Sequence, residues 1–336
     1  MAMRPRLSEI AGLAAVSEAT VSRVLNAKPG VANDTRRRVL DVLADLGYAD
    51  VHRKAAGTGA VGIVTPELSN PIFPHLAQQM ESVFAHHGYI SLVCSSTSET
   101  VHEQDFLDFL MAHGASGVVV INGRYALPDV GYEPYQALRA KGIPVVLVNG
   151  FADEPPIPSV AVNVVEAASH AVHYLGSLGH ERIGMLSGPR RYPTANDLVA
   201  GYERGLGEMD VSVDESLISE TSWTIEGGQA GAAKLLEQGV TGIVCGNDLM
   251  AMGVVSVART WGVSVPEDLS VIGFDGSPMA SYIDPPLTTL RQPAAVMAKA
   301  VASELVGNQR SETSHHFQRF RAELVIGRST GRPPAG

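Results

Sequence analysis

The amino-acid sequence predicts an α/β protein with a small N-terminal headpiece of three helices, containing a helix-turn-helix, and a core of two doubly wound parallel-sheet subdomains. Residues 7–47 carry apolar side chains at helical spacing, with turn residues between the helical stretches. From Ala60 onward, short runs of Val, Ile and Leu alternate with amphipathic stretches of helix length, which is typical of a parallel sheet covered on both faces. A chain of 336 residues also exceeds one ordinary core, so several folding units are expected.

The headpiece, residues 1–48, divides into three short helices. The expected capping residues are Ser8 for the first helix, Ser17 for the second, and Asn33 or Asp34 for the third. Apolar positions fall on one side of each helix: Leu7, Ile10, Ala11 and Ala14, then Val21, Val24 and Leu25, then Val39, Val42, Leu43 and Leu46. Three helices of this length bury little surface, so we expect them to be marginally stable alone.

The core, residues 61–330, follows a linker at 49–60. The expected strands are Val61–Thr65, Ile90–Cys94, Val118–Ile121, Val145–Val148, Ile183–Ser187, Gly242–Cys245 and Ser270–Phe274. The expected helices include Pro74–His87, Val164–Leu178, Thr194–Glu208 and Leu249–Trp261. A Pro-rich segment at 153–159 predicts an N-terminal subdomain of about 61–158 plus 290–315 and a C-terminal subdomain of about 159–289 plus 316–330. Ligands of such sheets bind beyond the carboxyl ends of the strands, so a cleft between the subdomains is the expected site.

Composition and charge narrow the function classes. Hydrophobic residues make up 45% and charged residues 18%, which excludes a disordered chain, and the longest apolar runs are strand-sized, which excludes a membrane span. The N-terminus, MAMRPRLSEI, has no apolar signal region, so a cytoplasmic location is expected. Cys94 and Cys245 lie in apolar runs and are interpreted as small core residues in a reducing compartment.

The net charge of −10 is unevenly distributed. Residues 1–56 hold nine basic and six acidic side chains, a net charge of +3, so the remainder carries −13. This asymmetry favours a headpiece that meets a polyanion while the acidic body does not. An ordinary solvated surface with a chance excess of basic residues is the alternative.

The second predicted helix has the surface of a DNA-reading helix. In a helix-turn-helix, the second helix lies in the major groove. Arg23 suits a bidentate contact with guanine, Ala19 a thymine methyl group, and Glu18 the amino group of cytosine. The short polar residues suited to phosphate contacts are Ser17, Thr20, Ser22 and Asn26. An amphipathic helix in a generic bundle is the alternative.

The headpiece sequence resembles a known family. Residues 6–48, and above all VSEATVSRVLN at 16–26, resemble the DNA-binding headpiece of the lactose-repressor/galactose-repressor (LacI/GalR) family of bacterial transcription regulators. Similarity extends along the chain through PELSNPIF (66–73), LGHERIGMLSGP (178–189), CGNDLMAMG (245–253), VPEDLSVIGFD (265–275), PPLTTLRQP (285–293) and LVIGRSTGRP (324–333). The resemblance implies a homodimer on a near-palindromic double-stranded operator, a periplasmic-binding-protein-like core that holds a small mono- or oligosaccharide effector, and repression of carbohydrate genes. The pattern is most similar to actinobacterial members that respond to maltose-type or plant-derived oligosaccharides.

The linker departs from the family pattern. Most members have a longer segment that forms a hinge helix and inserts a leucine into the minor groove, whereas ADVHRKAAGTGA at 49–60 is shorter and has no leucine. Arg53 and Lys54 are the residues expected to enter the groove. Because an apolar wedge is what kinks the duplex, we expect weaker operator bending than is usual in the family.

The resemblance also implies the effector residues, which are Ser69, Asn70, Phe73, Asn149, Trp223, Asn247, Asp275 and Gln292. Amide and carboxylate groups hydrogen-bond sugar hydroxyls, and an aromatic ring covers the C–H face of a sugar. Three have structural alternatives: Asp275 as a turn residue, Asn247 as a helix cap and Trp223 as a core residue. Leu198 stands where many sugar-binding members have arginine; Arg190 or Arg191, or Asn196 or Asp197, are the possible replacements.

Other motifs point to no cofactor, metal or catalysis. Residues 57–62 match the dinucleotide pattern G-x-G-x-x-G, but they precede a strand instead of following one, which favours a linker. His170 and His173 are one helical turn apart without an evident third metal ligand. Two other function classes compete with the regulator. A transport solute-binding protein is opposed by residues 7–47 and the missing signal peptide, and an enzyme is opposed by the missing nucleophile motifs.

Overall fold

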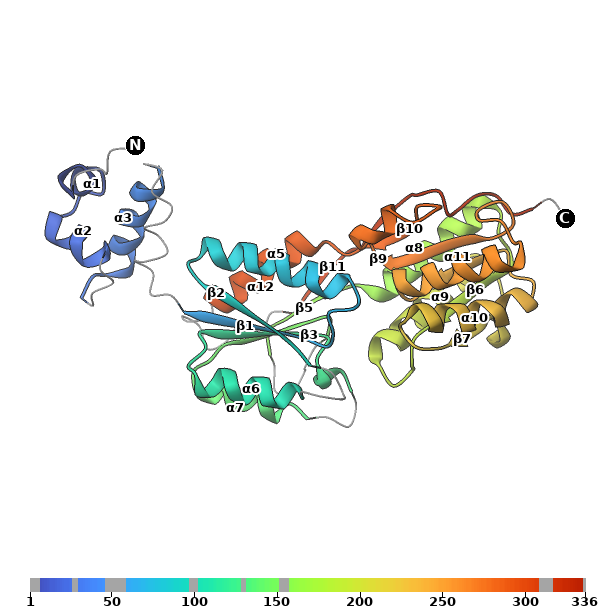
Figure 1. Ribbon diagram of the computed structural model, residues 1–336, viewed down its shortest axis with the longest axis horizontal. Coiled ribbons are helices and arrows are strands. Elements are labelled where there is room, and N and C mark those ends of the chain that lie inside the picture. The colour runs from blue at the N-terminus through green and yellow to red at the C-terminus, as the bar shows by residue number, and fades with distance from the viewer. Residues whose placement is uncertain are drawn as a thin grey trace.

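The computed structural model describes residues 7–25, 30–45, 59–96, 102–127, 131–150, 157–307 and 317–334. These residues form a helical headpiece and two α/β subdomains that follow one another along the long axis of the molecule (Figure 1). No helix in this described part is long and apolar enough to cross a membrane.

The headpiece consists of α1 (Leu7–Leu13), α2 (Glu18–Leu25) and α3 (Asn33–Asp45). Its core contains Ile10, Ala11, Ala14, Val21, Val24, Val39, Leu40 and Leu43. Ser17 caps α2 as predicted, since its Oγ accepts a hydrogen bond of 3.1 Å from the backbone N–H of Thr20. The other two capping predictions are wrong, because α1 begins at Leu7 and α3 at Asn33, which places the proposed caps inside the first turns.

The first core sheet has the strand order β11-β5-β4-β3-β1-β2, and every pairing in it is parallel. Its strands are β1 (Ala60–Thr65), β2 (Ile90–Ser95), β3 (Gly117–Ile121), β4 (Val145–Val148), β5 (Ser159–Val162) and β11 (Phe317–Phe320). The helices α5 (Ile72–His86) and α12 (Ala294–Gly307) cover one face, and α6 (Glu103–Ala112) and α7 (Glu133–Ala140) cover the other (Figure 1). The short helix η1 (Arg124–Ala126) follows β3.

The second core sheet has the order β12-β10-β9-β8-β6-β7, with β12 antiparallel to β10. Its strands are β6 (Ile183–Ser187), β7 (Ile218–Glu220), β8 (Gly242–Cys245), β9 (Ser270–Asp275), β10 (Thr288–Arg291) and β12 (Glu323–Val325). Its helices pack as two pairs, α8 (Val164–Leu178) with α9 (Pro193–Glu208), and α10 (Ile225–Glu237) with α11 (Asp248–Trp261). Short helices at Glu215–Leu217 (η2) and Pro278–Ser281 (η3) complete this subdomain.

The predicted subdomain boundaries need correction. Ser159–Val162 pairs with β4 and therefore belongs to the first sheet, one strand beyond the predicted boundary. Phe317–Phe320 pairs with β5, so it also belongs to the first sheet, whereas Thr288–Arg291 lies beside β9 in the second. The Pro-rich segment at 153–159 thus precedes the last central strand of the first sheet and is no boundary.

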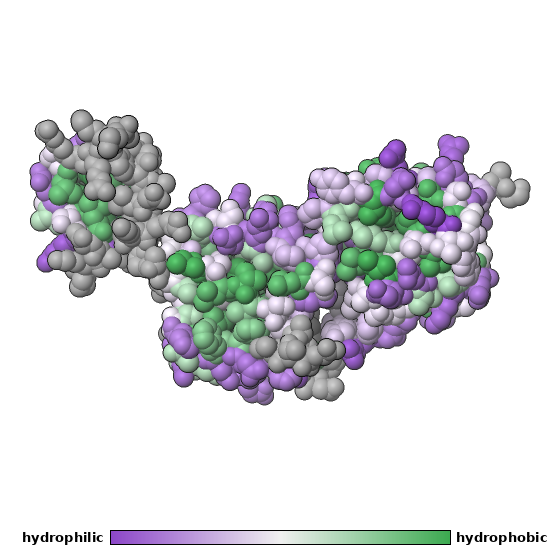
Figure 2. Space-filling model, viewed as in Figure 1, coloured by the Kyte–Doolittle hydropathy of each residue, from purple (hydrophilic) through white to green (hydrophobic). Residues whose placement is uncertain are grey.

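The edge strand β2 departs from the buried pattern of its neighbours. Ile90, Leu92 and Val93 are 51%, 40% and 47% exposed. Cys94, predicted to be a core residue, is only half-buried here, whereas Cys245 in β8 is fully buried as predicted. Figure 2 shows apolar side chains gathered over this part of the first core sheet. An exposed apolar edge strand is a surface that a partner chain can cover.

Candidate functional site

The α2 helix presents an exposed face that is held by a buried one. Val21 and Val24 have no exposed surface, which fixes the rotation of the helix. Glu18, Ala19 and Arg23, the predicted base-reading residues, are all exposed. The exposed face of α2 therefore carries a guanidinium, a methyl group and a carboxylate.

The predicted phosphate-contacting residues surround this face. The Ser17 hydroxyl lies 2.9 Å from that of Thr20, and Ser22 is half-buried on the next turn. The predicted contacts Asn26, Arg53 and Lys54 lie outside the described residues, as does most of the linker.

A chain of hydrogen bonds joins the two subdomains at the carboxyl ends of their strands. Asn149, at the end of β4, donates from Nδ2 to Oε1 of Gln292 over 3.2 Å. Gln292, just after β10, donates from Nε2 to Oδ1 of Asp275 over 2.7 Å. Asn70, from the loop after β1, hydrogen-bonds the same carboxyl group. The structure thus brings four of the predicted effector residues into one network between the sheets.

Asp275 is held in an unusual backbone conformation. Its φ is +106°, in the left-handed region that few non-glycine residues adopt. A buried neighbour, Asp248, stabilises this turn by accepting hydrogen bonds from Ser277 N over 2.7 Å and from Thr289 Oγ1 over 2.6 Å. Thr289 Oγ1 in turn accepts from Gly276 N over 3.2 Å. Hydrogen bonds from the backbone N–H groups of Gly276 and Ser277 therefore hold the turn that carries Asp275 in place.

The two buried carboxyl groups also influence each other. Burial, followed by the charge of Asp248, raises the pKa of Asp275 well above its ordinary value, and hydrogen bonds from Gln292 and Asn70 oppose this rise. Burial raises the pKa of Asp248 to about 6, against the same kind of opposition from Thr289 and Ser277. An environment that disfavours two carboxylates also disfavours an anionic ligand next to them.

The indole ring of Trp223 packs on two glycines at the carboxyl edge of the second sheet. The Trp223 ring covers Gly188 and Gly246 so closely that a Cβ on them would lie 2.0 Å and 2.7 Å from ring atoms. Asn247 caps α11 by accepting from Met250 N over 2.8 Å, which confirms the capping interpretation, and it donates to the carbonyl oxygen of Trp223 over 3.0 Å. Leu198 is buried, so the position that many relatives fill with arginine is apolar here.

The remaining predicted residues lie outside the network. Arg190 and Asn196 are exposed and joined by a hydrogen bond of 2.9 Å from Asn196 Nδ2 to the Arg190 carbonyl oxygen. Ser69 is exposed and donates to the carboxylate of Glu67. Phe73 is half-buried and packs against the core.

Sequence reasoning missed two residues of this region, Asp248 and Asn122. Asn122 ends β3 as Asn149 ends β4, and both have positive φ, +46° and +59°. A signal was present, because the segments VVVING and VVLVNG each end an apolar strand with Asn-Gly. The hydrogen bonds by which Asp248 holds this turn join residues far apart in the sequence, and no local pattern indicated them.

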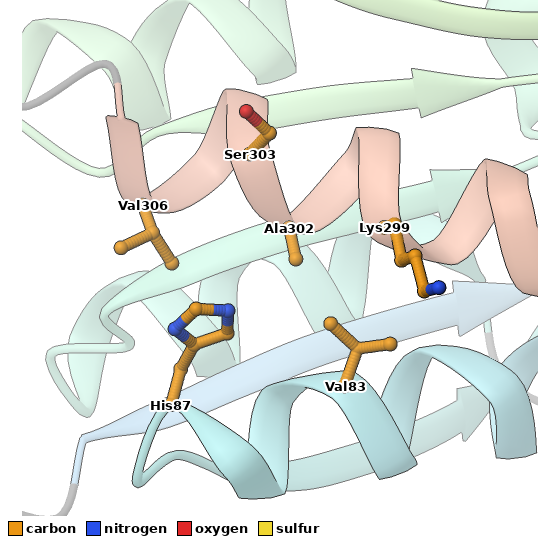
Figure 3. Close-up of a pocket in the computed structure, with 6 residues that line it drawn as sticks. All are labelled: Val83, His87, Lys299, Ala302, Ser303 and Val306. Atoms are coloured by element: carbon orange, nitrogen blue, oxygen red, sulfur yellow. The ribbon is translucent and has the colours of Figure 1, made fainter. Parts of the chain in front are cut away.

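Two other features of the described residues differ from this site. A pocket of about 300 Å³ lies between α5 and α12 (Figure 3), and it is lined by Val83, His87, Lys299, Ala302, Ser303 and Val306. None of the predicted effector residues lines it. Among the described residues, no group of three or more His, Cys, Asp or Glu side chains could hold a metal ion, and His173 instead lies 3.2 Å from Glu208.

Comparison with known proteins decides the family. Residues 6–50 match the profile of the lacI family of bacterial regulatory proteins, and residues 172–330 match the periplasmic binding protein-like domain. The HTH-type transcriptional regulator MalR of Streptomyces coelicolor is 40% identical over 99% of this chain and 98% of its own length. The chain belongs to the LacI family. It is a DNA-binding transcriptional regulator whose periplasmic-binding-protein-like core fits an effector.

Two further transcriptional regulators match nearly the whole chain. The HTH-type transcriptional repressor CytR of Escherichia coli is 32% identical over 98% of this chain and 97% of its own length. The solved structure of the regulator CelR in complex with cellobiose superposes with a TM-score of 0.72 at 25% identity, covering 97% of this chain and all of CelR.

Proposed function

We propose that this LacI-family regulator represses carbohydrate genes, and that an uncharged sugar bound between the two subdomains controls its grip on the operator. The hydrogen-bonded chain from Asn149 through Gln292 to Asp275 carries the proposal, because it joins residues of both sheets at their carboxyl ends. A ligand that replaces these bonds changes how the subdomains are held together. Operator affinity can then change by no more than the difference in the effector's binding free energy between the two subdomain arrangements.

The chemistry of this edge supports a neutral, hydroxyl-rich effector. Amide and carboxyl groups suit hydroxyls, and the Trp223 ring suits the C–H face of a sugar. The buried pair Asp248 and Asp275 opposes a phosphorylated sugar. The structural neighbour CelR binds cellobiose, and the resemblance to regulators of maltose-type sugars adds maltose as the second candidate.

Operator binding is assigned to the exposed face of α2. Arg23 is the strongest base-reading residue, with Glu18 and Ala19 beside it. Two headpieces are needed for two half-sites, and the exposed apolar strand β2 supports pairing of two copies of this chain. The regulator acts by binding DNA and its effector, without catalysing a reaction, in the cytoplasm where its operator lies.

The test is a fluorescence-anisotropy titration of operator DNA with the parent chain and with Arg23→Ala. The parent is expected to prefer its operator over a scrambled duplex, and the variant to lose about 1–3 kcal/mol of that preference. Both should weaken steeply as salt rises, because bound Lys and Arg release counterions from phosphates. Equal, sequence-independent binding by parent and variant would contradict the assignment.

The effector is tested in the same assay. Maltose, maltotriose, cellobiose and glucose 6-phosphate are added to the preformed complex, and tryptophan fluorescence is followed in parallel in a Trp261→Phe background, which leaves Trp223 as the emitter. A neutral sugar should change operator affinity and the Trp223 signal together, while glucose 6-phosphate changes neither. Sugar binding without any operator preference would instead favour a solute-binding protein.

A further inference from the structure

We propose that Tyr125 is a positioning residue of this regulator: it holds the turn at Asn149, and with it the hydrogen bond from Asn149 to Gln292 that joins the two subdomains. The inference rests on the proposed function, because it names what fixes the bond that the effector is proposed to replace. It assigns no effector contact to Tyr125, which is only 4% exposed.

The Tyr125 ring lies against two glycines that follow neighbouring strands. Tyr125 belongs to η1, the short helix after β3, whereas Gly150 comes shortly after β4. A Cβ built on Gly150 would lie 2.2 Å from Cε2 of the ring, and one built on Gly123 would lie 2.9 Å from Cε1. The glycine that follows each strand-ending asparagine therefore leaves space that this ring occupies.

The Tyr125 hydroxyl fixes the peptide group that precedes Asn149. It donates to the carbonyl oxygen of Val148 over 2.7 Å, and the carbonyl oxygen of Val120 lies 3.4 Å away. The other end of the same peptide group is also held, since Asn149 N donates to Val160 O over 2.9 Å. Asn149 has a φ of +59°, a conformation that non-glycine residues keep only where the surrounding structure enforces it. The hydroxyl contributes directly to that enforcement.

The turn at Asn149 places a side chain that connects the two sheets. Its Oδ1 accepts from Val162 N, in β5, over 3.4 Å, while its Nδ2 donates to Gln292 over 3.2 Å. Both ends of the carboxamide are therefore engaged, and a change in φ moves it away from both partners. A residue that holds this turn also holds the connection between the subdomains.

A second buried layer keeps Tyr125 in place. Its ring meets that of Tyr135 edge-on, with 5.7 Å between the ring centroids and 77° between the ring planes. The carboxyl group of Glu103, which is 4% exposed, accepts from the Tyr135 hydroxyl and, over 2.8 Å, from Arg124 N. Burial, followed by the charge of Glu103, raises the pKa of the Tyr125 hydroxyl, which therefore stays protonated and remains a donor.

The test compares Tyr125→Phe with a matched control, Tyr202→Phe. Both substitutions remove one buried hydroxyl and keep the ring, since Tyr202 has no exposed surface and donates to Ile183 O over 2.8 Å. Ile183 begins β6, at the sheet end opposite to the expected cleft, whereas Val148 ends β4. Val148 O keeps its bond from Asn122 N in the first variant, so neither substitution orphans an acceptor at the cleft.

The first measurement follows the Asn149 carboxamide without any sugar. In the full chain with isotopically labelled asparagine, its Nδ2 signals are assigned by their absence from Asn149→Asp, and their hydrogen exchange with water is measured by NMR. Exchange should be about 3- to 10-fold faster in Tyr125→Phe, because the loss of one hydrogen bond makes the turn open more often. Tyr202→Phe should exchange like the parent.

The second measurement is the affinity for maltose and cellobiose, by calorimetric titration of the full chain. When Asn149 is held less well, the sugar has to order it on binding, so affinity for the responding sugar should fall about 3- to 10-fold in Tyr125→Phe. Tyr202→Phe should bind sugar like the parent, although both variants should lower the unfolding midpoint by similar amounts. A role in stability alone would lower both midpoints and leave exchange and sugar affinity unchanged.

The inference is overturned if Asn149 in Tyr125→Phe exchanges within twofold of the parent rate, or if Tyr202→Phe accelerates its exchange equally. Faster exchange with unchanged sugar affinity would also overturn it, because the turn would then have no consequence for the effector. If the parent itself binds none of the sugars, the proposed function fails, and the exchange measurement still decides whether Tyr125 holds the turn.

Discussion

In the headpiece, the side chains assigned to DNA project from α2 into solvent, whereas in the core the assigned effector residues Asn70, Asp275 and Gln292 are buried and joined by hydrogen bonds. Arg23 and Glu18 are exposed, and only the small cluster beneath α2 orients them. Asp275 and Gln292 are each 7% exposed and are fixed by direct bonds. A substitution on the exposed face of α2 should therefore change recognition without changing stability, while a substitution at the core edge should change both.

The largest effect is expected from the headpiece core. Leu43 is 1% exposed, and Leu43→Ala should destabilise this small unit by about 2–5 kcal/mol, the usual cost of a large-to-small core change. Operator binding should then be lost, while the main calorimetric transition and sugar affinity stay at their parent values. The control is Leu13→Ala, because Leu13 is 61% exposed in the same headpiece. Equal operator binding by Leu43→Ala and Leu13→Ala would contradict the dependence of DNA recognition on the headpiece core.

A smaller, pH-dependent effect is expected at the core edge. The folded protein raises the pKa of Asp248 to about 6 through burial, so the folded state favours the protonated carboxyl. The stability that this group contributes is present below the ordinary carboxyl pKa near 4 and is lost as pH rises through 6. Asp248→Asn cannot ionise, so its unfolding free energy should rise relative to the parent by about 1–3 kcal/mol between pH 4 and pH 7.

Urea unfolding of both proteins at several pH values measures this difference. A constant offset is expected from the altered hydrogen bond to Ser277 N, so the slope with pH is the informative quantity. Parallel curves would show that Asp248 does not titrate in this range.

The smallest effect is expected at the start of α2. Ser17→Ala removes the cap on Thr20 N and should cost the headpiece about 1 kcal/mol, whereas Ser17→Thr keeps an oxygen in place. The headpiece transition in calorimetry should shift for alanine and recover for threonine. A shift in sugar affinity in either variant would contradict the separation between headpiece and core.

Central strands and long helices were predictable because their own sequence encodes them. Val145–Val148, Ile183–Ser187 and Val164–Leu178 have the predicted bounds, since each is an apolar run or stripe with clear ends. Among the strands that were missed, β7 and β12 span three residues each, and β11 has two polar residues between two aromatic ones. Such segments form strands only because they pair with a strand that is distant in the sequence. For β11 that strand is β5.

The residues of the candidate site were predictable through the family resemblance, but the hydrogen bonds between them were not. Asn149, Asp275 and Gln292 were named without any indication that they bind one another. The bond between Asn149 and Gln292 joins positions 143 residues apart, and no local sequence pattern indicates such a contact. Asn122 shows the reverse case: a local Asn-Gly signal was visible, but only the structure shows that its Oδ1 is buried without a hydrogen-bond partner among the described residues.

The order of strands has one more consequence. The chain runs through β1–β5 in the first sheet and β6–β10 in the second, then returns for β11 and leaves again for β12. Three connections therefore span the two lobes, and no single scission of the polypeptide releases either of them as an intact fragment. A nicked molecule would stay together, and bending between the lobes requires all three connections to swivel in concert, which restricts the motion to a narrow set of directions.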